Sequence, residues 1–201
     1  MKKIVLASAS RRRREILKSL GLDFTVIPSR IREKEDLTLK PELVVQKIAL
    51  RKAESVAQKL RIKRNAPGNT VVIGADTIVV LPRGDIVGKP HGRAEAREIL
   101  GKLSGTTHYV YTGIAVMDVK ATKKITDYEK SVVKMKKLTS TEIEESSQKH
   151  LDKAGSYGIQ EKRDVFVTLV SGTFDNVVGL PVKKLEKALG EFITEKKRYH
   201  G

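Results

Sequence analysis

The sequence predicts an α/β protein with a mixed, twisted sheet flanked by helices. Predicted strands and helices alternate along the first half of the chain, which is typical of a partly parallel sheet. Two long segments, residues 107–118 and 124–135, have the pattern of an antiparallel hairpin. The 201 residues, 39% of them hydrophobic, can bury the core of one domain or of two small lobes. We expect a cleft beside the sheet.

The first half of the chain supplies the alternating elements. Residues 2–7 form an apolar run that predicts a buried strand. Residues 14–20 carry apolar side chains at helical spacing before Gly21 stops the helix. Residues 23–28 alternate like a second strand. Pro41 suits the first turn of a long amphipathic helix over residues 42–64.

The rest of the chain is richer in strands. Residues 70–82 are β-branched and apolar, which favours a strand. Ser140 is the predicted cap of a helix, because serine oxygens accept from the free N–H groups of a first turn. No repeat and no long linker interrupts the chain, so we predict one domain over residues 1–201. The remaining predicted elements are strands at 84–90, 107–118 and 124–135, a strand at 164–172 with a return strand, and helices at 93–103, 139–150 and 181–196.

Composition excludes several classes of protein. The chain has no cysteine, so it has no disulfide, no thiol nucleophile and no cysteine-bound metal. The apolar run after the initiating residues is too short for a secretory signal and is closed by four arginines. Asp76 interrupts the most apolar stretch, which argues against a membrane span. We therefore predict a soluble, cytoplasmic protein with no membrane partner.

The net charge of +16 raises the alternative of a basic nucleic-acid-binding protein without catalysis. The excess lies mainly in residues 1–64, which carry 18 basic and 7 acidic side chains. Against this alternative, only 4% of residues are aromatic, and no base-stacking or recognition-helix motif is visible. Nucleic acid is therefore not predicted as the primary partner.

The first candidate site is the run from Ser8 to Arg14, at a predicted junction of strand and helix. Free N–H groups and the helix dipole attract anions there, and arginines add paired donors for phosphate oxygens. The alternative is a serine-capped helix with a solvated basic turn. Cations at a helix N-terminus are mildly unfavourable, so four in a row call for an explanation.

The second candidate is Asp76, in the segment GADT within an apolar strand. An ionised carboxylate buried there without a partner would be very costly, so Asp76 must meet a cation, a metal ion or a cleft. A structural salt bridge is the competing interpretation. Lys89, between Gly88 and Pro90, is either a fixed charge aimed at phosphate or an ordinary loop lysine.

The third candidate is Gln160, at the end of the segment LDKAGSYGIQ. Its amide can donate and accept at once, which suits the edge of a nucleobase, although a turn glutamine would look the same. Glu33 and Lys52 gain meaning only if they face Asp76 and the basic loop; taken singly they are typical surface charges.

Six segments stand in the order and spacing found in one known family. They are LASASRRRREIL, GADTIVV, GKP, YTG, DKAGSYGIQ and FDNVVGLP. The chain resembles the Maf family of nucleoside triphosphate pyrophosphatases, related in architecture to inosine triphosphatases. This resemblance implies an elongated fold of two lobes around a central cleft, a homodimer, and metal-dependent hydrolysis of a triphosphate to the monophosphate and pyrophosphate. The expected substrates are dTTP, UTP or modified pyrimidine nucleotides, with a role in nucleotide-pool house-cleaning or in arrest of cell division. A structural protein of cell division without turnover is a separate alternative.

The resemblance implies roles for individual residues. Asp76 matches the catalytic acid, which activates water or holds the metal, and Glu33 matches a second metal-side carboxylate. The cation would be Mg²⁺, Mn²⁺ or Co²⁺. Residues matching the branch that acts on dTTP and UTP are Arg12, Thr77 and Gln160. The triphosphate cradle matches Ser8, Arg12, Arg13, Lys52 and Lys89.

Three positions depart from the family pattern. Arg11 replaces a proline, Arg32 replaces an acidic neighbour of Glu33, and Glu161 replaces the glycine after Gln160. Because Glu161 is bulky and negative beside the proposed base-reading residue, it bears on which nucleotide is preferred.

Overall fold

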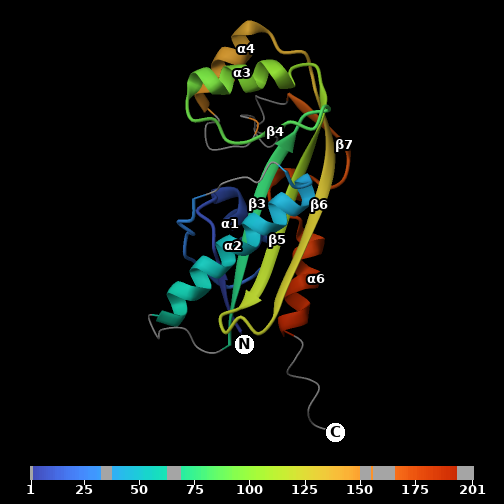
Figure 1. The fold of residues 1–201 in the computed structure, drawn as a ribbon. Coiled ribbons are helices and arrows are strands. Elements are labelled where there is room, and N and C mark those ends of the chain that lie inside the picture. Colours follow the sequence, from blue (N-terminus) through green and yellow to red (C-terminus); the bar gives the residue numbers. More distant parts are fainter. Residues whose placement is uncertain (1, 33–37, 63–68, 150–154, 156–165, 194–201) are drawn as a thin grey trace. The chain divides into compact units, whose positions relative to one another are not determined.

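The computed structural model describes residues 2–32, 38–62, 69–149, 155 and 166–193. Its strands are β1 (Lys3–Leu6), β2 (Phe24–Val26), β3 (Thr70–Val80), β4 (Ile86–Val87), β5 (Thr107–Asp118), β6 (Lys124–Met135) and β7 (Val167–Ser171) (Figure 1). Its helices are α1 (Arg11–Ser19), α2 (Pro41–Ile62), α3 (Arg93–Leu103), α4 (Ser140–Lys149), α5 (Phe174–Val178) and α6 (Val182–Ile193). Along these described ranges, no helix is both long enough and apolar enough to cross a bilayer.

The strands form one mixed sheet. The order is β2-β1-β3-β5-β6-β7, with β4 paired to β3, which makes seven strands within the described residues. β1 runs parallel to both β2 and β3, whereas β4 and β7 run antiparallel to their neighbours. Only residues 119–123 join β5 to β6. A parallel crossover needs about a dozen residues, so this pair is a hairpin. The predicted α/β class with a mixed sheet is confirmed.

The chain divides into two compact units. The first unit comprises residues 1–76, 112–129 and 179–201, and the second comprises residues 77–111 and 130–178. β3, β5 and β6 each contribute residues to both units.

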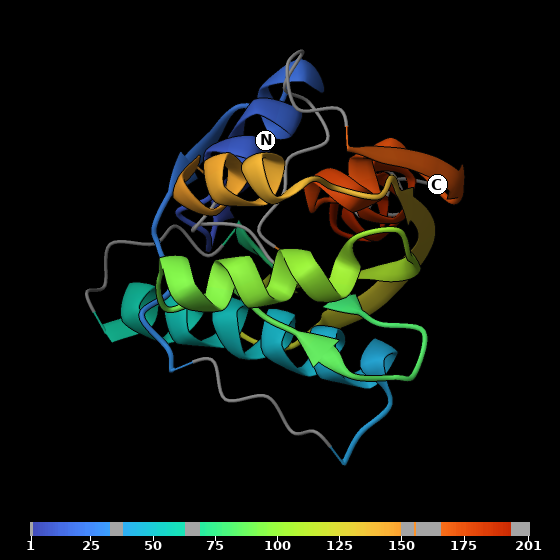
Figure 2. The ribbon, with the colours of Figure 1, turned by 90° about the horizontal axis from the view of Figure 1, so that it is seen from above.

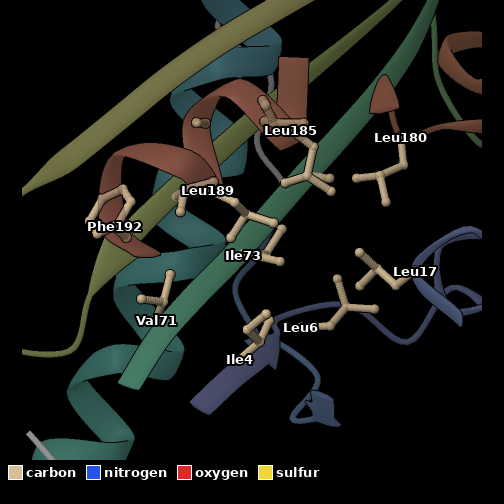
Figure 3. Packing of buried hydrophobic residues seen from close by; sticks show 13 residues of the cluster. Ile4, Leu6, Leu17, Val71, Ile73, Leu180, Leu185, Leu189 and Phe192 are labelled. Atoms are coloured by element: carbon tan, nitrogen blue, oxygen red, sulfur yellow. The ribbon is translucent and has the colours of Figure 1, made fainter. Parts of the chain in front are cut away.

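The first unit buries apolar side chains on both faces of its part of the sheet. One layer joins β1 and β3 to α1 and α6 (Figure 3). Its fully buried members include Leu6, Leu17, Ile73, Leu180 and Leu185. The other face carries α2, which packs small side chains against the strands. This second layer contains Val5, Ala49, Ala53, Val56, Val72 and Ala115. Because the buried side chains of α2 recur at helical spacing, one face of this helix packs against the sheet along most of the length of the helix.

The second unit has its own core. α3 and α4 lie side by side (Figure 2). Apolar side chains of α3 and of the strand segments in this unit fill the core, among them Val79, Leu100, Leu103, Val110, Val133 and Met135. The strand and helix bounds predicted for residues 93–135 agree with the structure in this region.

The cap of α4 differs from the prediction. Thr139, rather than Ser140, holds the first turn: Glu142 N donates to Thr139 Oγ1 at 3.2 Å, and Thr139 N donates to Glu142 Oε2 at 2.9 Å. This reciprocal pair is a capping box, which satisfies two free donors at once. A single serine cap could satisfy only one, so the prediction of Ser140 was wrong.

The segment after β7 also differs from the prediction. A return strand was expected there, but the chain enters the short helix α5. Asn176 N donates to Thr173 Oγ1 at 3.3 Å, so Thr173 caps this turn. The Asn176 side chain is buried and donates to Ser131 Oγ at 2.8 Å and to Val110 O at 3.2 Å. These tertiary hydrogen bonds favour a helical turn over an extended strand.

His108, on β5 in the second unit, makes stability depend on pH. It is fully buried, and burial lowers its pKa from 6.5 to about 4, although a backbone hydrogen bond at Thr106 opposes the shift. In the unfolded chain His108 takes up a proton as the pH falls below 6.5. In the folded protein it does so only near pH 4, its lowered pKa. The free energy of unfolding should therefore fall by about 3 kcal/mol as pH drops across this window. Urea unfolding at several pH values measures this slope.

The control for this prediction is the pair of variants His108→Asn and His91→Asn. His91 is exposed, so His91→Asn serves as the reference for replacing a histidine outside the core. Removing His108 should flatten the slope, whatever it does to the absolute stability. An unchanged slope in His108→Asn would contradict the assignment.

Candidate active site

A buried ion pair lies at the centre of β3. Lys52, on α2, places its Nζ 2.7 Å from Asp76 Oδ1, and each side chain is only 7% exposed. Of the partners expected for Asp76, which were a cation, a metal ion or a cleft, the structure shows a cation, Lys52, and this pair is also the salt bridge of the competing interpretation. Two opposite charges this close satisfy each other, which offsets part of the cost of taking both out of water.

Gly74 allows α2 to come close enough for this pairing. A Cβ atom at Gly74 would lie 2.1 Å from Ala49 O, a distance that no real side chain tolerates. Gly74 and Asp76 project from the same face of β3, because side chains alternate along a strand. Ala49 and Lys52 are neighbours on one face of α2. The glycine contact therefore sets the helix beside the strand where Lys52 meets Asp76.

Replacing Gly74 with alanine should destabilise the fold. Because the new methyl group meets backbone rather than a movable side chain, α2 must shift, and we expect a loss of about 3 kcal/mol, the upper part of the usual range for overpacking. Urea unfolding monitored by circular dichroism measures the change.

Gly101 in α3 and Gly190 in α6 are matched controls, since a Cβ atom at either meets nothing within 4 Å. Alanine there should raise stability by about 0.5–1 kcal/mol, through lower entropy of the unfolded chain. Equal effects at Gly74 and Gly190 would refute the close-approach argument.

Ser8 and Arg13 form a second polar cluster, at the start of α1. The buried Arg13 guanidinium donates from Nη1 to Ser8 Oγ at 3.2 Å and to Ala75 O at 2.9 Å. Its Nε donates to Gly179 O at 2.8 Å. Ala75 directly precedes Asp76, so this cluster adjoins the ion pair along β3. Ser10 is the observed cap of α1, as its oxygen accepts from Arg13 N.

The other predicted residues with described positions are Arg12, Thr77 and Lys89. Arg12 is half-buried on α1, and Thr77 is half-buried on β3, next to Asp76. Lys89 is exposed after β4 in the second unit. Within that unit, Gly155 N donates to Gly88 O at 3.3 Å, which places Gly155 beside the residue that precedes Lys89. Gly155 has φ +75°, a conformation that favours glycine.

Two predicted residues, Glu33 and Gln160, lie outside the described residues. In the ranges that the structure does describe, no group of three or more histidine, aspartate or glutamate side chains could hold a metal ion. Of the two carboxylates predicted to bind metal, only Asp76 has a described position.

Two backbone features of the site are absent from the sequence predictions. The sequence contains a weak signal for Gly74, because an isolated glycine inside an apolar strand often marks a place where other backbone comes close. The carbonyl of Gly179 gave no signal, since any residue carries a carbonyl and its partner Arg13 is 166 positions away.

The mixed sheet, the buried pair and the arginine cluster define an α/β protein with a charged site on β3. A family model described as "Maf-like protein" matches residues 3–192. The chain belongs to the Maf family, which confirms the resemblance seen in its motifs.

Named relatives cover almost the whole chain. A dTTP/UTP pyrophosphatase of Acetivibrio thermocellus is 45% identical over 194 residues, covering 96% of this chain and 96% of that protein. A dTTP/UTP pyrophosphatase of Bacillus anthracis is 42% identical over 194 residues, with the same coverage of both chains. A crystal structure of a nucleoside-triphosphatase (dITP/XTP pyrophosphatase) from Mycobacterium abscessus covers 97% of this chain and 100% of its own, at 12% identity and a TM-score of 0.42.

Proposed function

We propose that the protein hydrolyses nucleoside triphosphates, with dTTP and UTP preferred, to the monophosphate and pyrophosphate. The observation that carries this proposal is the buried Asp76 carboxylate, held 2.7 Å from Lys52 Nζ. A carboxylate fixed at one position is the group that in-line attack by water needs, either as a base or as a metal ligand. Membership of the Maf family, and relatives named dTTP/UTP pyrophosphatase at 42–45% identity, support the same reaction.

The proposed substrate is a polyanion, which cations and fixed donors can hold. A nucleoside triphosphate carries about four negative charges, and further charge develops as pyrophosphate leaves. In our proposal Ser8, Arg12, Lys52 and Lys89 contact the phosphates, since fixed donors and cations stabilise such charge most where water is excluded. The burial of Lys52 and Ser8 supports this arrangement.

The proposal includes a divalent cation, Mg²⁺, Mn²⁺ or Co²⁺. Mg²⁺ is bound by hard oxygen donors, commonly one or two carboxylates together with substrate phosphates and waters. Asp76 fits this chemistry, and Glu33 is the second carboxylate that we propose. When bound, the cation would neutralise charge on the phosphate oxygens. Asp76 would hold it or orient the attacking water, and Lys52 would keep the Asp76 carboxylate in place.

Nucleotide preference is assigned to Arg12, Thr77 and Gln160, which match the branch of the family that acts on pyrimidine triphosphates. An amide at the base edge can distinguish pyrimidines through paired hydrogen bonds. We also propose a cytoplasmic homodimer of two-lobed subunits, each a single domain with a central cleft; sedimentation at several concentrations tests the dimer.

The test is a panel of ribo- and deoxyribonucleoside triphosphates assayed with Mg²⁺, Mn²⁺ or Co²⁺. We expect pyrophosphate and a nucleoside monophosphate, with the fastest turnover for dTTP and UTP. Release of orthophosphate with a diphosphate product would contradict the bond assigned. Absence of turnover under every condition would favour a structural role.

Nucleic-acid binding is a second candidate, favoured by the net charge of +16. The run of arginines is engaged within the protein, however: Arg13 is buried, and Arg11 pairs with Glu15 at 2.8 Å. We therefore expect weak oligonucleotide binding that disappears as salt rises. Tight, sequence-dependent binding that survives salt would favour this second candidate.

A further inference from the structure

Arg13 differs from the arginines beside it in burial. Its residue surface is 9% exposed, whereas the Arg11 side chain is 84% exposed. Burying a guanidinium costs free energy unless its N–H groups find acceptors. Arg13 meets this demand inside the protein, through the three hydrogen bonds described above.

The three acceptors come from three separate segments of the chain. Ser8 follows β1, Ala75 lies in β3, and Gly179 precedes α6. All three acceptors are neutral oxygens, and two of them are backbone carbonyls. A planar guanidinium can reach acceptors in several directions at once, which a lysine ammonium on a flexible stem cannot reproduce.

The bond to Gly179 gives a role to the motif FDNVVGLP, which no part of the proposed reaction uses. Gly179 is buried and has φ +115°, a backbone conformation that favours glycine. In this conformation the Gly179 carbonyl oxygen lies 2.8 Å from Arg13 Nε. The motif therefore supplies one fixed wall of the arginine cluster.

We propose that Arg13 is a positioning residue that holds the backbone of β3 immediately before Asp76. This inference rests on the proposed function, because its consequence is measured as the rate of pyrophosphate release. Through Ala75 O it fixes the strand that carries Asp76, and through Ser8 and Gly179 it anchors that strand to β1 and to the segment before α6. This role replaces the phosphate contact that the family resemblance implied for Arg13.

A positioning role and a phosphate contact predict different kinetics. A phosphate ligand contributes binding to the substrate, so its loss raises KM and weakens the affinity for substrate analogues. A positioning residue sets the geometry of the reacting groups, and a displacement of about 1 Å can reduce the rate about 100-fold. Loss of Arg13 should therefore lower kcat and leave binding nearly unchanged.

The experiment compares Arg13→Lys and Arg13→Met with Arg11→Ala, a control in the same arginine run. For each folded variant, kcat and KM are measured with dTTP. Affinity is measured with a dTTP analogue that carries nitrogen in place of the oxygen bridging the α and β phosphates. We expect kcat to fall about 30- to 100-fold in both Arg13 variants, with analogue affinity within about threefold of wild type. Arg11→Ala should match wild type in both measurements.

The outcomes separate this inference from the proposed function. If Arg13→Lys keeps kcat within about threefold while analogue affinity falls about tenfold, Arg13 is a phosphate ligand and the inference is wrong, although the reaction stands. Unchanged kinetics in both Arg13 variants would also overturn it. Failure of both variants to fold would overturn it too, since Arg13 would then determine the fold. If wild-type protein releases no pyrophosphate from any nucleotide, the proposed function fails first.

Discussion

Asp76→Asn protein is expected to release pyrophosphate about 1,000-fold more slowly than wild type, within the range for loss of a general base or metal-side carboxylate. Asparagine has nearly the same shape and retains an oxygen for Lys52, so the local geometry should persist. Its amide cannot take up a proton from water and is a poor ligand for a divalent cation. The measurement is the rate of pyrophosphate release from dTTP under saturating conditions.

The substitution also leaves the Lys52 ammonium buried beside a neutral group, so some stability is lost. The assay is therefore run well below the Tm of the variant. Asp85→Asn is the matched control, because Asp85 is an exposed acid in the turn after β3. It should turn over dTTP at the wild-type rate. Wild-type activity in Asp76→Asn would refute the role of this carboxylate.

Lys52→Met should lower the free energy of unfolding by about 3–5 kcal/mol, the cost of leaving one buried charge without its partner. The side chains of Lys52 and Asp76 are each 7% exposed, so water can do little to compensate. The double variant Lys52→Met, Asp76→Leu removes both charges. Its stability should return close to wild type, because replacing a buried pair with apolar side chains is often neutral or favourable. Urea unfolding of Lys52→Met, of Asp76→Leu and of the double variant completes the cycle.

A surface pair provides the comparison. Arg97 and Glu144 approach to 2.9 Å, but their side chains are 50% and 47% exposed. Arg97→Met should change stability by less than about 1 kcal/mol. If Lys52→Met costs no more than Arg97→Met, the pair at Asp76 is effectively solvated and the buried-charge argument fails.

The sequence predicted best the elements whose signals are local. The bounds of α3, β5 and β6 follow from apolar periodicity and agree with the structure. Gly21 ends α1 as expected, with φ +67°. The wrong predictions lie where two local structures compete. Thr139 caps α4 together with Glu142, and the buried hydrogen bonds of Asn176 favour a helix after β7.

The site was predictable to the level of residue type but not of geometry. An acid alone in an apolar strand had to meet a cation, a metal ion or a cleft, and Lys52 was a candidate only on the condition that it faced Asp76. That choice depends on α2 crossing β3 at Gly74, a tertiary contact. The bonds from Arg13 to Ala75 and Gly179 join residues 62 and 166 positions apart. Spacing along the chain carries no record of such contacts.

Heat alters the balance at the pair of Lys52 and Asp76. The hydration of ions becomes less favourable as temperature rises, so the desolvation of two charges costs less free energy in hot solution than at room temperature. The apolar double variant should therefore lose ground to wild type on warming. The desolvation cost of a buried pair of opposite charges therefore counts less against stability at high temperature, relative to apolar side chains of the same volume.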